Sequence, residues 1–148
     1  MRVVVADDQT EVRLALRLLL ESQQMRVVGE AAGMKELFTQ VWGQLPDLLL
    51  LDWELPHSLS QQELISSLRL LSPHMRVVAL SSHMEARQPA LKAGADLFIS
   101  KGSPPNKLIR ALQSFTAARA GTPPVRAARP RGGTHRAAFF ATRRILHF

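Results

Sequence analysis

Residues 47–52 read Asp-Leu-Leu-Leu-Leu-Asp, an apolar run bounded by two acids. Four consecutive leucines do not alternate with polar residues, and such a run is typical of a strand that is buried on both faces of a parallel sheet. Pro46 precedes the run and a polar loop, 53–60, follows it. We therefore expect a strand over Asp47–Leu51, with Asp52 at its carboxyl end.

Four further segments have the same apolar character, and each is followed by a stretch with apolar residues at helical spacing. The expected strands are Val3–Ala6, Met25–Ala31, Arg76–Leu80 and Leu97–Ser100. The expected helices are 10–22, capped by Thr10, then 34–44, 61–71, 85–93, stopped by Gly94, and 104–118. A strand followed by a helix, five times over, predicts an α/β fold with a doubly wound, five-stranded parallel sheet that carries helices on both faces.

The excess positive charge is confined to the C-terminal end of the chain. Of the 148 residues, 1–118 hold 12 Lys or Arg and 12 Asp or Glu, whereas 119–148 hold seven Arg and no acid, which accounts for the net charge of +7. The last segment is also rich in Pro and Gly, which is typical of linkers and disordered chain. We predict one domain over 1–120 and a basic, disordered tail over 121–148 that is too short for a recognisable output domain.

Composition excludes several classes of protein. The chain has no cysteine, which excludes disulfides, thiol catalysis and cysteine-based zinc sites. No apolar run approaches the roughly 18 residues of a membrane-spanning helix. The apolar run after Arg2 is also too short for a signal peptide. We therefore expect a cytoplasmic protein without membrane contacts.

Polar side chains that suit a phosphate site follow four of the five expected strands. They are Asp7 and Asp8 after the first strand, Asp52 after the third, Ser81 and Ser82 after the fourth, and Lys101 after the fifth. In a parallel sheet these carboxyl ends share one edge, where functional groups gather. Three carboxylates repel one another unless a cation joins them, and Mg²⁺ suits a site with few carboxylates and a phosphate. The lysine and a hydroxyl complete a site for phosphoryl transfer, which depends on positioning and charge neutralisation.

Each of these residues also has an ordinary structural explanation when taken alone. Asp7 and Asp8 suit the start of a helix, whose dipole favours acids, and Asp52 suits a turn at a strand end. Ser81 suits a helix cap, and Lys101 suits an exposed surface. Their joint placement directly after four strands favours one shared site over four separate explanations.

The sequence resembles the receiver domain of bacterial two-component response regulators over about residues 1–118. The matching stretches are 3–8, 50–56, 78–82 and 93–102, in that order and at that spacing. Two stretches, 27–31 and 101–104, further resemble the subfamily whose receiver precedes a helix-turn-helix DNA-binding domain. The resemblance implies a flavodoxin-like receiver fold and a phosphoacceptor signalling module with slow autodephosphorylation, not an enzyme with a separate substrate.

The resemblance also implies the chemistry of the site. Asp52 is expected to accept a phosphoryl group from a sensor histidine kinase in a Mg²⁺-dependent reaction. Asp8 and Asp52 are expected to bind Mg²⁺ directly, together with the backbone carbonyl of Glu54, while Asp7 holds the metal through water.

The resemblance implies a switch as well. Ser81 is expected to donate a hydrogen bond to the phosphoryl oxygen, and Lys101 to pair with it. Phe98 is expected to move inward when Ser81 moves toward the phosphate. This movement is expected to remodel the face formed by the fourth helix, the fifth strand and the fifth helix, a face through which the chain could form a homodimer.

Two features depart from the family pattern. The loop after Pro56 lacks the Asp-Gly pair of many members and has apparently one extra residue, so we expect its shape to differ, and we interpret His57 as a loop residue. Glu54 lies two positions after Asp52, a position that influences how long the phosphoryl group lasts in the family.

Three other functions are open at this point. The Arg-rich tail could bind nucleic acid non-specifically, and the chain could be a DNA-binding regulator whose output domain is missing or reduced to that tail. A hydrolase of the haloacid-dehalogenase type is disfavoured, because it requires Asp-x-Asp after the first strand, where this chain has adjacent Asp7 and Asp8. A receiver-like fold that is never phosphorylated is disfavoured because all the expected acid, hydroxyl and lysine positions are filled.

Overall fold

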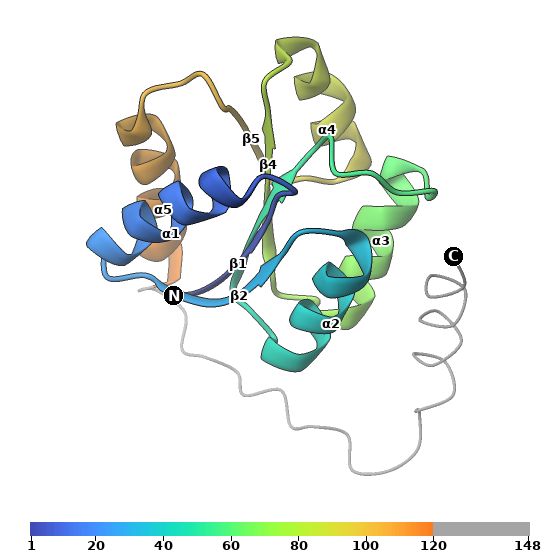
Figure 1. Cartoon of the computed structure of the whole chain (residues 1–148), viewed down its shortest axis with the longest axis horizontal. Coiled ribbons are helices and arrows are strands. Elements are labelled where there is room, and N and C mark those ends of the chain that lie inside the picture. The colour runs from blue at the N-terminus through green and yellow to red at the C-terminus, as the bar shows by residue number, and fades with distance from the viewer. Residues whose placement is uncertain (120–148) are drawn as a thin grey trace.

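The chain folds as a parallel sheet between two layers of helices, as the computed structural model in Figure 1 shows. The structure describes residues 1–119. The strands are β1 (Arg2–Ala6), β2 (Arg26–Ala31), β3 (Leu48–Asp52), β4 (Arg76–Ser81) and β5 (Leu97–Ser100). The helices are α1 (Thr10–Ser22), α2 (Met34–Gln44), α3 (Gln61–Leu71), η1 (Met84–Ala86, a 3-10 turn), α4 (Arg87–Ala93) and α5 (Pro105–Arg119). The expected α/β class and the expected order of elements are confirmed, while the predicted tail, 121–148, lies outside the described residues.

The strands are ordered β2-β1-β3-β4-β5 and all pair in parallel. The chain therefore starts near the centre of the sheet, extends to one edge through β2, and returns through β3 to the other edge at β5. The order reverses between β1 and β3, which is where open α/β sheets bind their ligands. Both of these strands end in aspartates, so the topology itself brings Asp7, Asp8 and Asp52 together.

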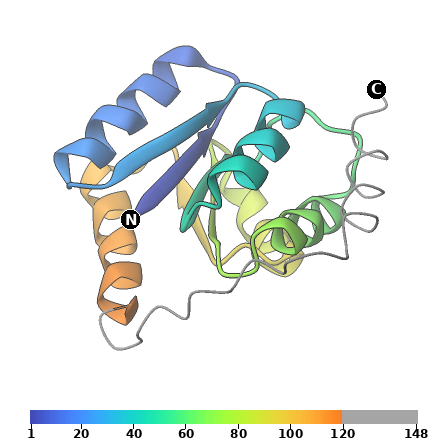
Figure 2. The same cartoon turned by 90° about the horizontal axis from the view of Figure 1, so that it is seen from below.

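The leucines of β3 alternate between two cores, although the sequence does not alternate. Leu49 and Leu51 pack into the core shared with α2, α3 and α4, while Leu48 and Leu50 pack into the core shared with α1 and α5. Figures 1 and 2 show these two helix layers on opposite sides of the sheet. All four leucines are fully buried, which explains why every position between the two acids is apolar.

The cap of α1 and the start of α4 differ from the sequence-based expectation. Thr10 was expected to cap α1, but it is the first helical residue, and the residue before it, Gln9, makes no side-chain cap. The Asp7 carboxylate takes the Gln9 N–H instead, at 2.9 Å from Oδ1. The expected helix over 85–93 is split into η1 and α4. The reason is Pro89, which has no N–H to donate to the carbonyl four residues earlier, so the regular α-helical pattern begins only at Arg87.

In residues 1–119, none of the helices combines the length and the apolar character that crossing a membrane requires.

We expect Leu50→Ala to lower the free energy of unfolding by about 2–5 kcal/mol, because it removes a fully buried side chain and leaves a cavity. Leu70→Ala is the matched control, since Leu70 is 77% exposed and surface changes of this kind usually stay within about 0.5 kcal/mol. Urea denaturation of both variants would measure the difference. Equal losses would contradict the assignment of Leu50 to the core.

Candidate functional site

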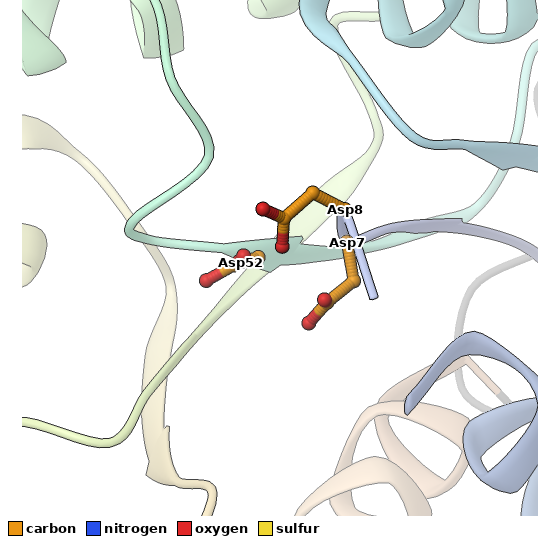
Figure 3. A group of neighbouring side chains, drawn as sticks. All are labelled: Asp7, Asp8 and Asp52. Atoms are coloured by element: carbon orange, nitrogen blue, oxygen red, sulfur yellow. The ribbon is translucent and has the colours of Figure 1, made fainter. Parts of the chain in front are cut away.

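Three aspartates meet at the carboxyl ends of β1 and β3. One carboxylate oxygen from each of Asp7, Asp8 and Asp52 lies within 4.8 Å of the others. Figure 3 shows the group, with Asp7 and Asp8 following β1 and Asp52 ending β3. Asp7 is fully buried, Asp52 is 4% exposed, and Asp8 lies on the surface. The site is therefore an acidic pocket that opens to solvent on the Asp8 side.

Lys101 bridges the two buried carboxylates. Its Nζ lies 2.7 Å from Oδ2 of Asp7 and 3.2 Å from Oδ1 of Asp52. Burial alone would lower the pKa of Lys101, but the hydrogen bond to Asp7 and the attraction of Asp52 outweigh burial and raise this pKa above its ordinary value. Lys101 is therefore a fixed positive charge at neutral pH, reaching the site from the end of β5.

The carboxyl group of Asp52 is a weaker acid than an ordinary aspartate. Burial raises the pKa of Asp52 to about 6, with further upward contributions from the Asp7 charge and the Glu54 side chain. The hydrogen bond from the Glu54 N–H, 3.1 Å from Oδ1, and the charge of Lys101 lower the pKa but do not cancel the effect of burial. The turn that brings the Glu54 N–H to this side-chain oxygen is closed by a second hydrogen bond. In it, the Leu55 N–H donates to the Asp52 backbone carbonyl oxygen at 3.1 Å.

The side chain of Asp7 is fully engaged within the protein. Its Oδ1 accepts from the Gln9 N–H and its Oδ2 from Lys101, while its backbone carbonyl oxygen accepts from Arg13 at 2.7 Å. Asp8, by contrast, makes no hydrogen bond or ion pair with any residue in 1–119. Asp8 and Asp52 therefore have the carboxylate oxygens best placed to bind a cation directly.

The residues present fit a hard divalent cation. Three carboxylate oxygens within 4.8 Å of one another carry more negative charge than the single Lys101 can balance. Oxygen ligands in small number, facing solvent, are the environment in which Mg²⁺ keeps part of its hydration shell. The acidic pocket is therefore the candidate metal centre of the described chain.

Ser81 ends β4 beside this pocket and is fully buried. Its Oγ donates to Oε1 of Glu54 in a short hydrogen bond and accepts from the His83 N–H at 3.0 Å. Its backbone carbonyl oxygen accepts from the Lys101 N–H at 2.9 Å, which joins the ends of β4 and β5. Phe98, on β5, is partly buried against the core under α4.

The loop after Pro56 is held by side-chain hydrogen bonds. Gln61 donates to the Trp53 carbonyl oxygen at 3.3 Å and contacts Nε2 of His57 at 3.0 Å. His57 is therefore a loop residue that contacts α3 and not the carboxylates, as expected. A capping box formed by Ser60 and Glu63 fixes the start of α3.

The structure brings together Asp7, Asp8, Asp52, Ser81 and Lys101 at one edge of the sheet. Ser82 is exposed, and Phe98 lies within β5, paired with Ala79 of β4. The contact between the Glu54 side chain and Ser81 was not predicted from the sequence. No spacing rule gives this contact, since the two residues are 27 positions apart, Glu54 in the turn after β3 and Ser81 at the end of β4.

Comparison with known proteins gives the same assignment. The model of the response regulator receiver domain family matches residues 3–113. The transcriptional regulatory protein YhcZ of Bacillus subtilis is 32% identical over 116 residues, which cover 76% of this chain and 54% of the relative. The signal receiver domain of the response regulator NarL from Mycobacterium tuberculosis is 30% identical, with a TM-score of 0.68 over 80% of this chain and 97% of that chain. A two-component response regulator of the LuxR family from Aurantimonas is 28% identical, with a TM-score of 0.70 over 79% of this chain and 85% of that chain.

The chain therefore belongs to the response regulator receiver domain family. A receiver domain is a phosphoacceptor signalling module and not a classical enzyme, as the sequence predicted. The similarity to the subfamily whose receivers precede a helix-turn-helix domain is confirmed by the LuxR-family relative. The chain spans about half the length of the curated relatives that it matches.

The raised pKa of Asp52 predicts a decrease in stability with rising pH. Below about pH 4 the carboxyl is protonated in both the folded and the unfolded chain, and the group has no effect on their balance. Between about pH 4 and pH 6 the unfolded chain loses this proton while the folded chain keeps it, so the contribution of Asp52 to stability falls and then levels off.

We therefore expect Asp52→Asn to raise the free energy of unfolding at pH 7.5, without Mg²⁺, by on the order of 3 kcal/mol, since the pKa rises from 3.8 to about 6 and a rise of one pH unit corresponds to about 1.4 kcal/mol. The gain should shrink toward zero at pH 4. Urea denaturation across this range measures both values. A gain that does not change with pH would contradict the raised pKa.

Proposed function

We propose that the chain receives a phosphoryl group from a histidine kinase on Asp52, in a Mg²⁺-dependent reaction, and that phosphorylation changes its protein-binding surface. The observation that supports this proposal best is the arrangement of Lys101 between Asp7 and Asp52, beside a solvent-facing third carboxylate. A single fixed cation and three carboxylates form a site that can neutralise a phosphoryl group only together with a divalent metal.

Each residue then has a role in the transfer. An oxygen of Asp52 attacks phosphorus in line with the phosphorus–nitrogen bond of the kinase phosphohistidine. That bond breaks with its electron pair on the histidine nitrogen, and the imidazole takes up a proton from solvent. Lys101 pairs with a phosphoryl oxygen and so stabilises the charge that moves onto it. Ser81 donates its hydroxyl hydrogen to a second phosphoryl oxygen. These three groups are supplied by three adjacent strands, β3, β4 and β5, which fixes their spacing before the donor arrives.

The metal would be held by Asp8 and Asp52 directly, by the Glu54 carbonyl oxygen, and by Asp7 through water. Bound Mg²⁺ supplies positive charge to the phosphoryl oxygens during transfer. Asp7 suits a supporting role because both of its carboxylate oxygens already accept hydrogen bonds from the protein.

The switch connects this site to a surface at the edge of the sheet. Ser81 and Phe98 lie on neighbouring strands, and Phe98 packs against the core under α4. A shift of Ser81 toward the phosphoryl group opens space that the Phe98 ring takes up, and α4, β5 and α5 then present a changed face. We place the protein in the cytoplasm, where histidine kinases use ATP. Regulation of transcription, as in relatives such as YhcZ, is part of this proposal, and a DNA-binding output is its second form.

Incubation of the full chain with acetyl phosphate and Mg²⁺ is expected to add one phosphoryl group, seen as a mass gain by intact-mass spectrometry. The gain should require the metal and should disappear in Asp52→Asn, because that variant lacks the attacking oxygen. Glu36→Gln, a change to an exposed acid on α2, is the control and should leave the gain intact. A mass gain that persists in Asp52→Asn would place the acceptor elsewhere.

The α4–β5–α5 face gives a prediction about self-association. Arg87 and Lys92 on α4 and Lys107 and Arg110 on α5 are exposed and form no ion pair with another residue of the described chain. A symmetric dimer through this face sets these cations against their own copies. We expect any phosphorylation-dependent dimer to strengthen as salt rises from about 50 to about 500 mM, because salt screens like charges. Sedimentation velocity at both concentrations tests this, and a dimer that weakens with salt would exclude this face.

A further inference from the structure

The Glu54 side chain takes the hydrogen bond that a phosphoryl group on Asp52 would need. Ser81 Oγ donates to Oε1 of Glu54, and the only other acceptor near this hydroxyl in the described chain is the His83 carbonyl oxygen, at 3.3 Å. The His83 N–H in turn donates to Oγ at 3.0 Å, which fixes the position of the oxygen. A serine hydroxyl has one hydrogen to donate. While Glu54 holds it, Ser81 has none for a phosphoryl oxygen.

Glu54 contacts both the phosphoacceptor, through its backbone, and the switch serine, through its side chain. The backbone N–H donates to Oδ1 of Asp52 at 3.1 Å, and the side chain of the same residue contributes to the raised pKa of Asp52. The Glu54 carboxylate therefore occupies the Ser81 hydroxyl from a turn that starts at the phosphoacceptor. The oxygens of a phosphoryl group on Asp52 have to come within hydrogen-bond distance of the same hydroxyl, if Ser81 is to reach one of them.

We propose that the Glu54 carboxylate is an internal stand-in for the phosphoryl group, and that phosphorylation proceeds by displacing it from Ser81. Glu54 is then a positioning residue that acts through Ser81. This inference rests on the proposed function and deepens it, because it assigns the step that limits entry of the phosphoryl group. Glu54 is exposed, so its carboxylate can move into solvent without breaking the core.

The exchange is balanced in bonds and charge. With acetyl phosphate as the donor, an Asp52 oxygen forms a bond to phosphorus, the bond from phosphorus to the acyl oxygen breaks, and acetate leaves with the electron pair. No proton is transferred. The Ser81 hydrogen bond passes from a Glu54 oxygen to a phosphoryl oxygen, both of which are anionic acceptors. In the unphosphorylated protein, Glu54 thus competes with the incoming group for the same donor.

Two variants of Glu54 and one control variant separate this competition from a simple effect of charge. Glu54→Gln keeps the shape of the side chain but removes its charge, which weakens its hold on the hydroxyl. Glu54→Asp keeps the charge but is one methylene shorter, which withdraws the carboxylate from Ser81. Glu85→Gln is the matched control, since Glu85 is 81% exposed in the neighbouring turn and pairs only with His83 in the described chain.

The rate of phosphorylation of the full chain by acetyl phosphate with Mg²⁺ is the first measurement. We expect both Glu54→Gln and Glu54→Asp to be phosphorylated roughly three- to tenfold faster than the unmodified chain, the range expected when a charge-assisted hydrogen bond no longer has to be exchanged. Glu85→Gln should not change the rate. An acceleration in Glu54→Gln alone, with Glu54→Asp unchanged, would show that only charge matters and would overturn the proposal.

The second measurement is a double-mutant cycle with Ser81→Ala. If Glu54 acts through Ser81, then Glu54→Gln should accelerate phosphorylation less than about twofold in the Ser81→Ala background. The same four proteins, unfolded in urea without Mg²⁺, should show non-additive midpoints, because the two side chains share one hydrogen bond. Additive midpoints, or an equal acceleration in both backgrounds, would overturn the proposal.

Failure of the proposed function gives a different result. It would appear as no mass gain in the unmodified chain and in every Glu54 variant, whatever the urea midpoints show, and this inference would fail with it. A gain that is unaffected by Glu54 would leave the phosphoacceptor role intact and would remove the inference alone.

Discussion

Two carboxylates, Asp7 and Asp52, are buried side by side and share the single ammonium group of Lys101. The other features of the site depend on this excess of negative over positive charge. Buried acids of like charge repel each other more strongly than surface acids, because little water screens them. Lys101 compensates for part of this charge. Burial, with a smaller contribution from the charge of Asp7, raises the pKa of Asp52, and the pocket stays acidic on the Asp8 side. The free protein thus keeps an excess of negative charge in this pocket, and a bound divalent cation would offset it. Repulsion between buried charges lowers the stability of the fold, and the apolar cores on both sides of β3 compensate for this loss.

The sequence predicts the scaffold well because the physical signals are local. An unbroken apolar run such as Leu48–Leu51 has few structural solutions, and the alternation of strands and helices leaves one economical topology. The candidate site follows from the same reasoning, since residues placed directly after parallel strands have to meet at one edge. Asp7, Asp8, Asp52, Ser81 and Lys101 were all found in this way.

The features that sequence analysis missed depend on side-chain geometry across turns. The contact of Glu54 with Ser81 needs a specific rotamer on a turn fixed by the Asp52 and Leu55 hydrogen bond. The cap of α1 was assigned wrongly because the Asp7 side chain, and not Thr10, accepts the free N–H of Gln9 there. The division of the expected helix into η1 and α4 is explained by Pro89. This proline lacks the N–H that would bond to the carbonyl oxygen four residues earlier. Side-chain contacts of this kind distinguish one member of a common fold from another.

The ion pair between Asp7 and Lys101 joins residues 94 positions apart in the chain. During synthesis, Asp7 and Asp52 are complete long before Lys101 leaves the ribosome, so a nascent chain has the acids but not their counter-charge. The strand β5, which delivers the lysine, is also the last strand of the sheet to be made. The set of charges at the site is therefore complete only when β5 has joined the sheet. Under the proposed function, a partly folded receiver has no complete site to offer a kinase, so phosphorylation would require a completely folded sheet.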